Sequence, residues 1–60
     1  MAKYEIMNRH GHIIDTFASK DGWTDAGAIG VMEAWADNGI GTYTLFKNGV
    51  FVASAKPEVF

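Results

Sequence analysis

The chain has 60 residues, a formal net charge of −2 and no cysteine. Disulfides and thiolate zinc sites are therefore excluded, together with the extracellular mini-proteins that depend on such cross-links. Hydrophobic residues make up 48% of the chain and aromatic residues 13%, which argues against an intrinsically disordered segment. We expect a single domain over residues 1–60, near the size at which a hydrophobic core barely offsets the entropy lost on folding.

The N-terminal sequence MAKYEIM lacks the apolar run of a secretory signal, and residues 26–32, the longest weakly polar stretch, are too few to span a bilayer. We therefore expect a cytoplasmic protein with no membrane partner. Its basic residues are scattered along the chain, so we do not expect direct binding to nucleic acid. These residues are Lys3, Arg9, Lys20, Lys47 and Lys56.

Residues 3–18 contain two strand-like segments on either side of a turn at Gly11, which predicts a β-hairpin with two open registers. A type I turn with Gly11 in the left-handed conformation pairs Asn8 with His12. It places on one face Tyr4, Ile6, Ile14 and Thr16. A tighter two-residue turn pairs Asn8 with Ile13 instead, because a one-residue slip exchanges the two faces of a strand. It places on one face Tyr4, Ile6, Ile13 and Phe17.

A helix is expected next, over residues 24–37, with Ser19, Asp21 and Thr24 as candidate N-caps. At 100° per residue this segment has a broad apolar face of the kind that packs on a sheet. The face consists of Ala28, Ile29, Val31, Met32, Trp35 and Ala36. Asn38-Gly39 then ends the helix, since both residue types tolerate the left-handed conformation that commonly terminates helices.

Asn48-Gly49 fits both positive-φ positions of a type I′ turn and predicts a second β-hairpin, which Pro57 ends. The predicted pairs are Phe46 with Phe51, Thr44 with Ala53, Leu45 with Val52, and Tyr43 with Ser54. The order β-β-α-β-β predicts an α+β fold with two layers, a four-stranded antiparallel sheet and one helix packed on one face. The opposite face of the sheet must then meet water, another chain or a partner.

That uncovered face is the first candidate for binding. Phe46 and Phe51 form an exposed cross-strand pair on it if Tyr43 and Leu45 point at the helix. The alternatives are that the two phenylalanines are the core pair, or that both are half-buried at an edge of the sheet. Exposed apolar patches are uncommon on monomers and commonly mark contacts, so we expect this face to bind a protein partner or to close a homodimer.

The side of the helix away from the sheet is the second candidate. Its small residues form a nearly flat stripe, and the region between Asp21 and Phe46 has four acids and no Lys or Arg, which would attract a basic partner. The alternative is an ordinary solvated helix face, with Trp23 folded against the edge of the core. The predicted partner-binding residues on the two surfaces are Trp23, Asp25, Ala26, Gly30, Glu33, Ala34, Asp37, Phe46 and Phe51.

Other kinds of site have weaker support in the sequence. His10 and His12 flank the first turn, but a metal site generally needs three or four converging ligands, so we expect no metal or other cofactor. A two-layer domain of this size has little room for a nucleophile beside a base, so we do not expect an enzyme. Single-stranded nucleic acid would stack on exposed sheet aromatics, yet the chain lacks a basic groove.

The segments YEIMNRHGHIIDTF and TYTLFKNGVFVA flank the acidic helix. In size, charge and element order the chain resembles small phage or mobile-element accessory proteins, including anti-CRISPR inhibitors. The resemblance implies binding and blocking of a host complex, in the host cytoplasm if the protein is phage-encoded, and it assigns no role to any residue. The leading hypothesis is a small acidic protein-interaction module that inhibits a host nucleic-acid-handling complex. The alternatives are a structural or self-assembling homodimeric domain and, third, a single-stranded nucleic-acid binder.

Overall fold

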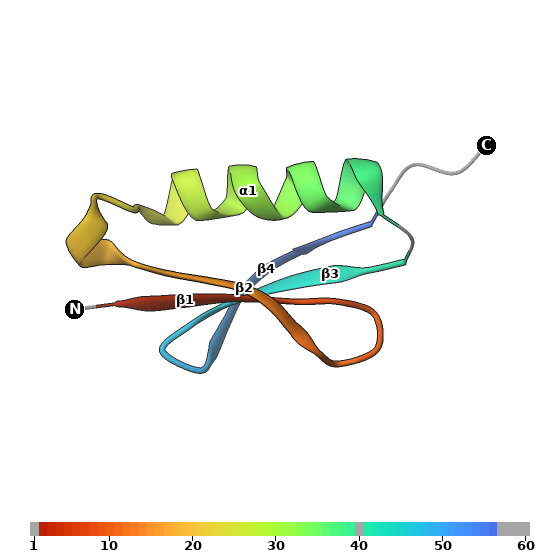
Figure 1. Cartoon of the computed structure of the whole chain (residues 1–60), viewed down its shortest axis with the longest axis horizontal. Helices are drawn as coiled ribbons and strands as arrows, with labels where there is room; N and C mark the ends of the chain where they lie inside the picture. The colour runs from red at the N-terminus through yellow and green to blue at the C-terminus, as the bar shows by residue number, and fades with distance from the viewer. Residues whose placement is uncertain (1, 40, 57–60) are drawn as a thin grey trace.

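The computed structural model describes residues 2–39 and 41–56 and confirms the predicted α+β fold. Four strands form one antiparallel sheet in the order β2-β1-β3-β4. They are β1 (Lys3–Met7), β2 (Ile13–Ala18), β3 (Tyr43–Lys47) and β4 (Val50–Ala55). A short 3-10 turn, η1 (Ser19–Asp21), leads into helix α1 (Asp25–Asn38), which lies on one side of the sheet (Figure 1). The predicted end of the last strand at Pro57 lies outside the described residues.

The helix begins at a side-chain cap. The Thr24 hydroxyl accepts a hydrogen bond from the Gly27 amide at 3.2 Å, so Thr24 is the N-cap among the three candidates. Ser19 and Asp21 belong to η1 instead. A capping hydroxyl satisfies one of the amide groups that have no partner in the first helical turn.

The helix ends at Gly39, but not in the predicted left-handed conformation. Gly39 has φ −111° and ψ −168°, which is extended backbone. A Cβ atom at this position would overlap the Tyr43 ring, with two ring carbons at 2.6 Å. Glycine is therefore needed here because the chain passes close to a buried tyrosine, and not because it turns.

The core lies between α1 and the two central strands. Its buried residues are Tyr4, Ile6, Ala28, Met32, Ala36, Tyr43 and Leu45. Full burial of a side chain such as Ile6 or Leu45 stabilises the fold by about 1.5–3 kcal/mol. The helix packs against β3 and β4. Because α1 is displaced toward this half of the sheet, the side of β2 that faces the helix is only partly covered.

The turn of the first hairpin follows the type I prediction. Gly11 has φ +80°, and the Asn8 amide donates a hydrogen bond to the His12 carbonyl at 2.9 Å. The Asn8 side chain also accepts hydrogen bonds from the His10 and His12 amides, both at 3.0 Å. These bonds hold the turn in the register that pairs Asn8 with His12.

A β-bulge at Ile14 then shifts the pairing of this hairpin. Met7 faces Ile13, but Ile6 faces Asp15, so every later residue of β2 changes side. The residues on the helix side are Tyr4, Ile6, Asp15 and Phe17. Both predicted faces are therefore wrong in part, since neither allowed for a bulge: Thr16 and Ile13 lie on the opposite side of the sheet.

The second hairpin has the predicted turn and a second bulge. Asn48 has φ +53° and Gly49 has φ +79°, and Phe46 faces Phe51 as predicted. A bulge at Val52 then makes the other three predicted pairs wrong by one residue. The observed pairs are Leu45 with Ala53, Thr44 with Ser54, and Tyr43 with Ala55. The bulge places alanines on the helix side of β4, where small side chains allow α1 to approach.

Candidate docking surfaces

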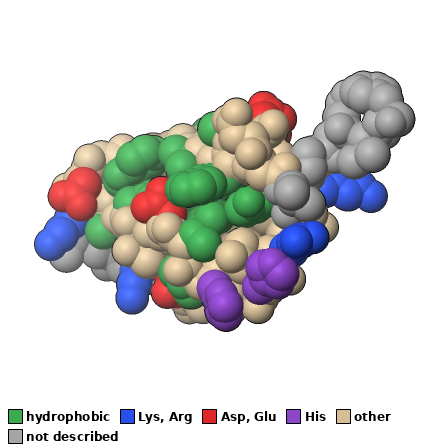
Figure 2. All heavy atoms as spheres, turned by 45° about the vertical axis from the view of Figure 1, so that its right-hand side comes forward, with side chains coloured by type: hydrophobic (Ala, Val, Ile, Leu, Met, Phe, Trp, Pro, Cys, Tyr) green, Lys and Arg blue, Asp and Glu red, His purple; other side chains and the backbone are tan. Residues whose placement is uncertain are grey.

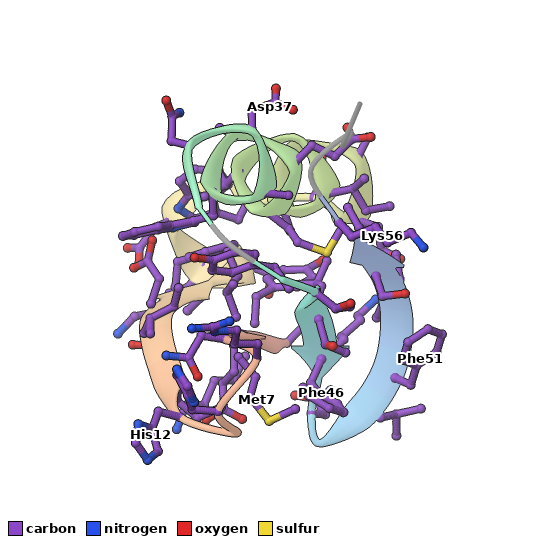
Figure 3. All side chains as sticks on the ribbon, turned by 90° about the vertical axis from the view of Figure 1, so that its right-hand side faces the viewer. Met7, His12, Asp37, Phe46, Phe51 and Lys56 are labelled. Atoms are coloured by element: carbon purple, nitrogen blue, oxygen red, sulfur yellow. The ribbon has the colours of Figure 1, made fainter. Side chains whose placement is uncertain are left out.

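The side of the sheet opposite α1, here called the outer face, carries apolar side chains from all four strands. Phe51 is 60% exposed and faces the half-buried Phe46, while Ile13 is 46% exposed and faces the half-buried Met7. Figure 3 shows Met7 and Phe46 next to each other on the side of the sheet away from the helix, and Phe51 on the outside of β4. We call these four residues the outer patch. The alternative that the two phenylalanines are the core pair is wrong, because Tyr43 and Leu45 hold that place.

The outer patch is bordered by a small, balanced set of charges. Glu5 lies between Thr16 and Phe46 in the sheet, and its carboxylate is 3.9 Å from the Lys3 ammonium group. Opposite charges on one strand two residues apart share a face of the sheet. The outer face therefore presents apolar and neutral polar groups around one ion pair, with no net charge from its strands.

The predicted residues on the back of the helix are exposed. They are Ala26, Gly30, Glu33, Ala34 and Asp37. Figure 3 shows Asp37 pointing away from the sheet, on the opposite side of the molecule from Phe46. The two candidate surfaces are therefore separate, and one flat partner surface cannot contact both at once.

Asp25, also predicted to bind a partner, has partners within the chain. The Tyr4 hydroxyl donates a hydrogen bond to its Oδ1 at 2.5 Å, and the Lys47 Nζ lies 3.2 Å from the same oxygen. The hydrogen bond from Tyr4, followed by that from Lys47, lowers the pKa of Asp25, and the bond to Asp25 raises the pKa of Tyr4. Asp25 thus joins the start of α1 to β1 and β3.

The two tryptophans lie at the margin of the core. Trp23 is half-buried and packs on Phe17, with 4.4 Å between the ring centroids, as the alternative for this residue predicted. Trp35 was predicted to lie on the face of the helix that packs on the sheet, but it is 40% exposed at the side of α1. Its ring stacks at 6.3 Å from Tyr43. The helix is displaced toward β4, and this displacement leaves Trp35 at the edge.

Met7 and Ile13 are the outer-patch residues that sequence reasoning missed. The type I turn does predict that they face each other, since it pairs Asn8 with His12 one position away. Met7 alternates with Tyr4 and Ile6 and therefore lies on the other side of the sheet, but the side of Ile13 stayed open because it differs between the two turn registers.

Other kinds of site find no support in the part of the chain that the structure describes. The His10 and His12 rings are 6.4 Å apart, and no group of three or more acidic or histidine side chains there is placed to hold a metal ion. No helix among the described residues has the length and apolar character needed to cross a membrane.

The sequence matches no protein-family model and no curated protein, and no solved structure matches the fold. The fold of the chain is a two-layer α+β domain. Because fold class does not determine function, the function must be inferred from the surfaces of the chain itself.

Proposed function

We propose that this chain is a small protein-interaction module that docks on a partner through the outer patch. The observation that carries the proposal is the presence of two apolar cross-strand pairs, Met7 with Ile13 and Phe46 with Phe51, on the side of the sheet without a helix. Two of these residues, Ile13 and Phe51, are among the most exposed large hydrophobic residues of the described chain. Contiguous apolar surface of this kind commonly marks a contact with another protein.

Strand formation alone does not explain the aromatic residue at position 51. Threonine has a similar preference for strands and leaves less apolar surface in water. Full burial of a phenylalanine in an interface contributes about 1.5–3 kcal/mol, and aromatic residues are enriched at interface centres. Phe51, with Phe46 beside it, is therefore the residue that we expect at the centre of an interface.

The acidic helix supports an inhibitory form of this function. With the outer patch against a partner, Asp37 faces away from the contact on the opposite side of the molecule, and Glu33 is exposed one helical turn before it. A docked domain would thereby add negative charge to the surface that it covers, and negative charge repels nucleic acid. Inhibition of a host nucleic-acid-handling complex is the version of the proposal that uses both surfaces.

A homodimer is the second candidate, favoured by the charge balance of the outer face. Its Lys3–Glu5 pair leaves no net charge to repel an identical face. Oligomerisation is also one of the ways in which chains of this size gain stability without cross-links. In this version the outer patch of one copy packs on that of another.

Comparative capture from an extract of the native host tests the proposal. The baits are the unmodified chain, Phe51→Thr and the matched control Val50→Thr. Val50 is 67% exposed and adjacent to Phe51, but successive strand residues point to opposite faces. We expect a protein retained by the unmodified chain and by Val50→Thr, and retained at least about tenfold less by Phe51→Thr, which is a typical effect of removing an interface anchor.

A fourth bait, Glu33→Gln with Asp37→Asn, separates the two surfaces. Loss of the captured protein from this bait alone would move the docking site to the back of the helix. Equal capture by Phe51→Thr and Val50→Thr would contradict the proposal. Light scattering on the same variants identifies the homodimer, which requires a doubled mass that Phe51→Thr abolishes.

A further inference from the structure

A second surface lies between α1 and β2 and is independent of the outer patch. Since α1 packs over β3 and β4, the helix-facing side of β2 is only partly covered. Asp15, Phe17, Trp23 and Trp35 border this opening, and we call them the aromatic flank. Figure 2 shows one face of the molecule, on which hydrophobic side chains gather around an acidic side chain.

The aromatic rings form two groups on either side of the Asp15 carboxylate. On one side Phe17 packs against Trp23, with ring centroids 4.4 Å apart. On the other side the Trp35 indole nitrogen donates a hydrogen bond to Asp15 Oδ2 at 3.5 Å. Phe17 and Asp15 are two residues apart on β2 and share the helix-facing side.

The Asp15 carboxylate has spare capacity to accept hydrogen bonds. The contact from Trp35 is long, and it is the one side-chain hydrogen bond to this carboxylate among the described residues. Neither ion pair of the described chain includes Asp15. An ionised carboxylate accepts about four hydrogen bonds.

The helix side of the flank is hollowed beside Trp35. A shallow hollow of about 270 Å³ is lined by Val31, Ala34, Trp35 and Asn38. This is below the range of about 300–1,000 Å³ that is typical of sites for drug-sized ligands. All of its lining residues belong to α1, so the hollow adjoins the flank at Trp35 and does not include Asp15.

We propose that the aromatic flank binds an arginine side chain presented by a partner protein. The guanidinium group would pair with the Asp15 carboxylate and lie against the Trp35 indole ring. Arginine is the side chain that combines these two contacts, since its planar group bonds carboxylates through two donors and stacks on aromatic faces. A phosphate or a carboxylate would be repelled by Asp15.

The tryptophans make this site directly observable, because both tryptophans of the chain belong to the flank. The probe is N-acetyl-arginine amide, and its matched control is the neutral isostere N-acetyl-citrulline amide. We expect a saturable change in tryptophan fluorescence with the arginine probe and at least about tenfold weaker binding of the citrulline probe, since charge-assisted bonds are the stronger ones.

Two variants assign the effect to Asp15. Asp15→Asn keeps an oxygen that accepts the indole hydrogen bond but removes the charge, so we expect at least about tenfold weaker arginine binding. Asp37→Asn removes one charge on the back of the helix and is expected to leave binding unchanged, and circular dichroism verifies that both variants fold. The inference is overturned by equal binding of the two probes, by unchanged binding in Asp15→Asn, or by no saturable response up to about 50 mM arginine probe.

Discussion

Asp25 shows how a side chain with more than half of its surface in water can still join three elements. Its carboxylate oxygen binds the Tyr4 hydroxyl from β1 and the Lys47 ammonium group from β3, while the residue itself begins α1. The Lys47 ammonium group also lies 5.9 Å from the centre of the Tyr4 ring. A carboxylate in the first turn is favourable for the helix dipole as well. The three side chains fix one end of the helix on the sheet.

This network predicts a loss of stability at both ends of the pH range. The pKa of Asp25 is lowered from 3.8. The contribution of Asp25 to the stability of the fold is therefore present above pH 3.8 and is lost as pH falls through the lowered pKa. The pKa of Tyr4 is raised from 10.0, so its contribution is present below pH 10.0 and is lost as pH rises through the raised pKa. We expect Tyr4→Phe to weaken the acid loss and to remove the part of the alkaline loss that is due to Tyr4.

Thermal unfolding midpoints measured from acid to alkaline pH check this prediction. Asp37→Asn serves as the control, because the described chain gives Asp37 no side-chain hydrogen bond or ion pair. It is expected to retain the alkaline loss of the unmodified protein. A Tyr4→Phe profile that parallels the unmodified one at both ends would show that the network does not link folding to pH.

Among the elements, one glycine inside helix α1 and one that directly follows the helix have opposite roles. Gly30 is exposed, and a Cβ atom there would meet nothing within 4 Å. We expect Gly30→Ala to raise the free energy of unfolding by about 1 kcal/mol, because alanine is the better helix former. Gly39→Ala is expected to lower it, since the new methyl group would overlap the Tyr43 ring.

Urea unfolding of the two alanine variants measures both effects. A destabilised Gly30→Ala would show that the back of the helix is packed against something in solution. If the outer patch is the docking surface, Gly30→Ala also captures the same partner as the unmodified chain. Loss of the partner from this variant would instead indicate close approach of another backbone to Gly30.

The sequence predicts those features of the elements that local chemistry decides. Asn48-Gly49 specifies the turn and therefore the pairing of Phe46 with Phe51, which was half of the outer patch. Thr24 has the side chain needed for the helix cap. The alternation of polar and apolar residues was sufficient to predict four strands and the α+β fold.

The two bulges and the position of the helix were not predictable in the same way. Both bulges lie in edge strands, at Ile14 and Val52, where an extra residue disturbs pairing with one neighbour only. Their placement depends on which side chains fit below α1, and this is a tertiary property. Periodicity likewise placed Trp35 toward the sheet, but the sideways displacement of the helix decides its exposure.

Across the whole molecule, the candidate surfaces lie on different elements. The acids Glu33 and Asp37 lie on the helix, and the outer patch lies on the side of the sheet away from it. The aromatic flank joins residues of α1 and β2 through the contact of Trp35 with Asp15. A single small domain thus has an apolar patch on one side and acidic residues on its helix, and in the proposed function the helix remains available when the patch is covered. This arrangement is what an inhibitor needs to hold a partner and change its surface charge together.

Nuclear magnetic resonance of the isotope-labelled chain in an unlabelled extract of its native host tests most directly whether the outer patch is the docking surface. We expect selective loss of amide signals around Met7, Ile13, Phe46 and Phe51, and recovery of these signals in Phe51→Thr. Signals from the helix back, such as that of Gly30, are expected to persist. Loss centred on the helix back, or equal signals throughout the chain with and without extract, would contradict an outer-patch docking site.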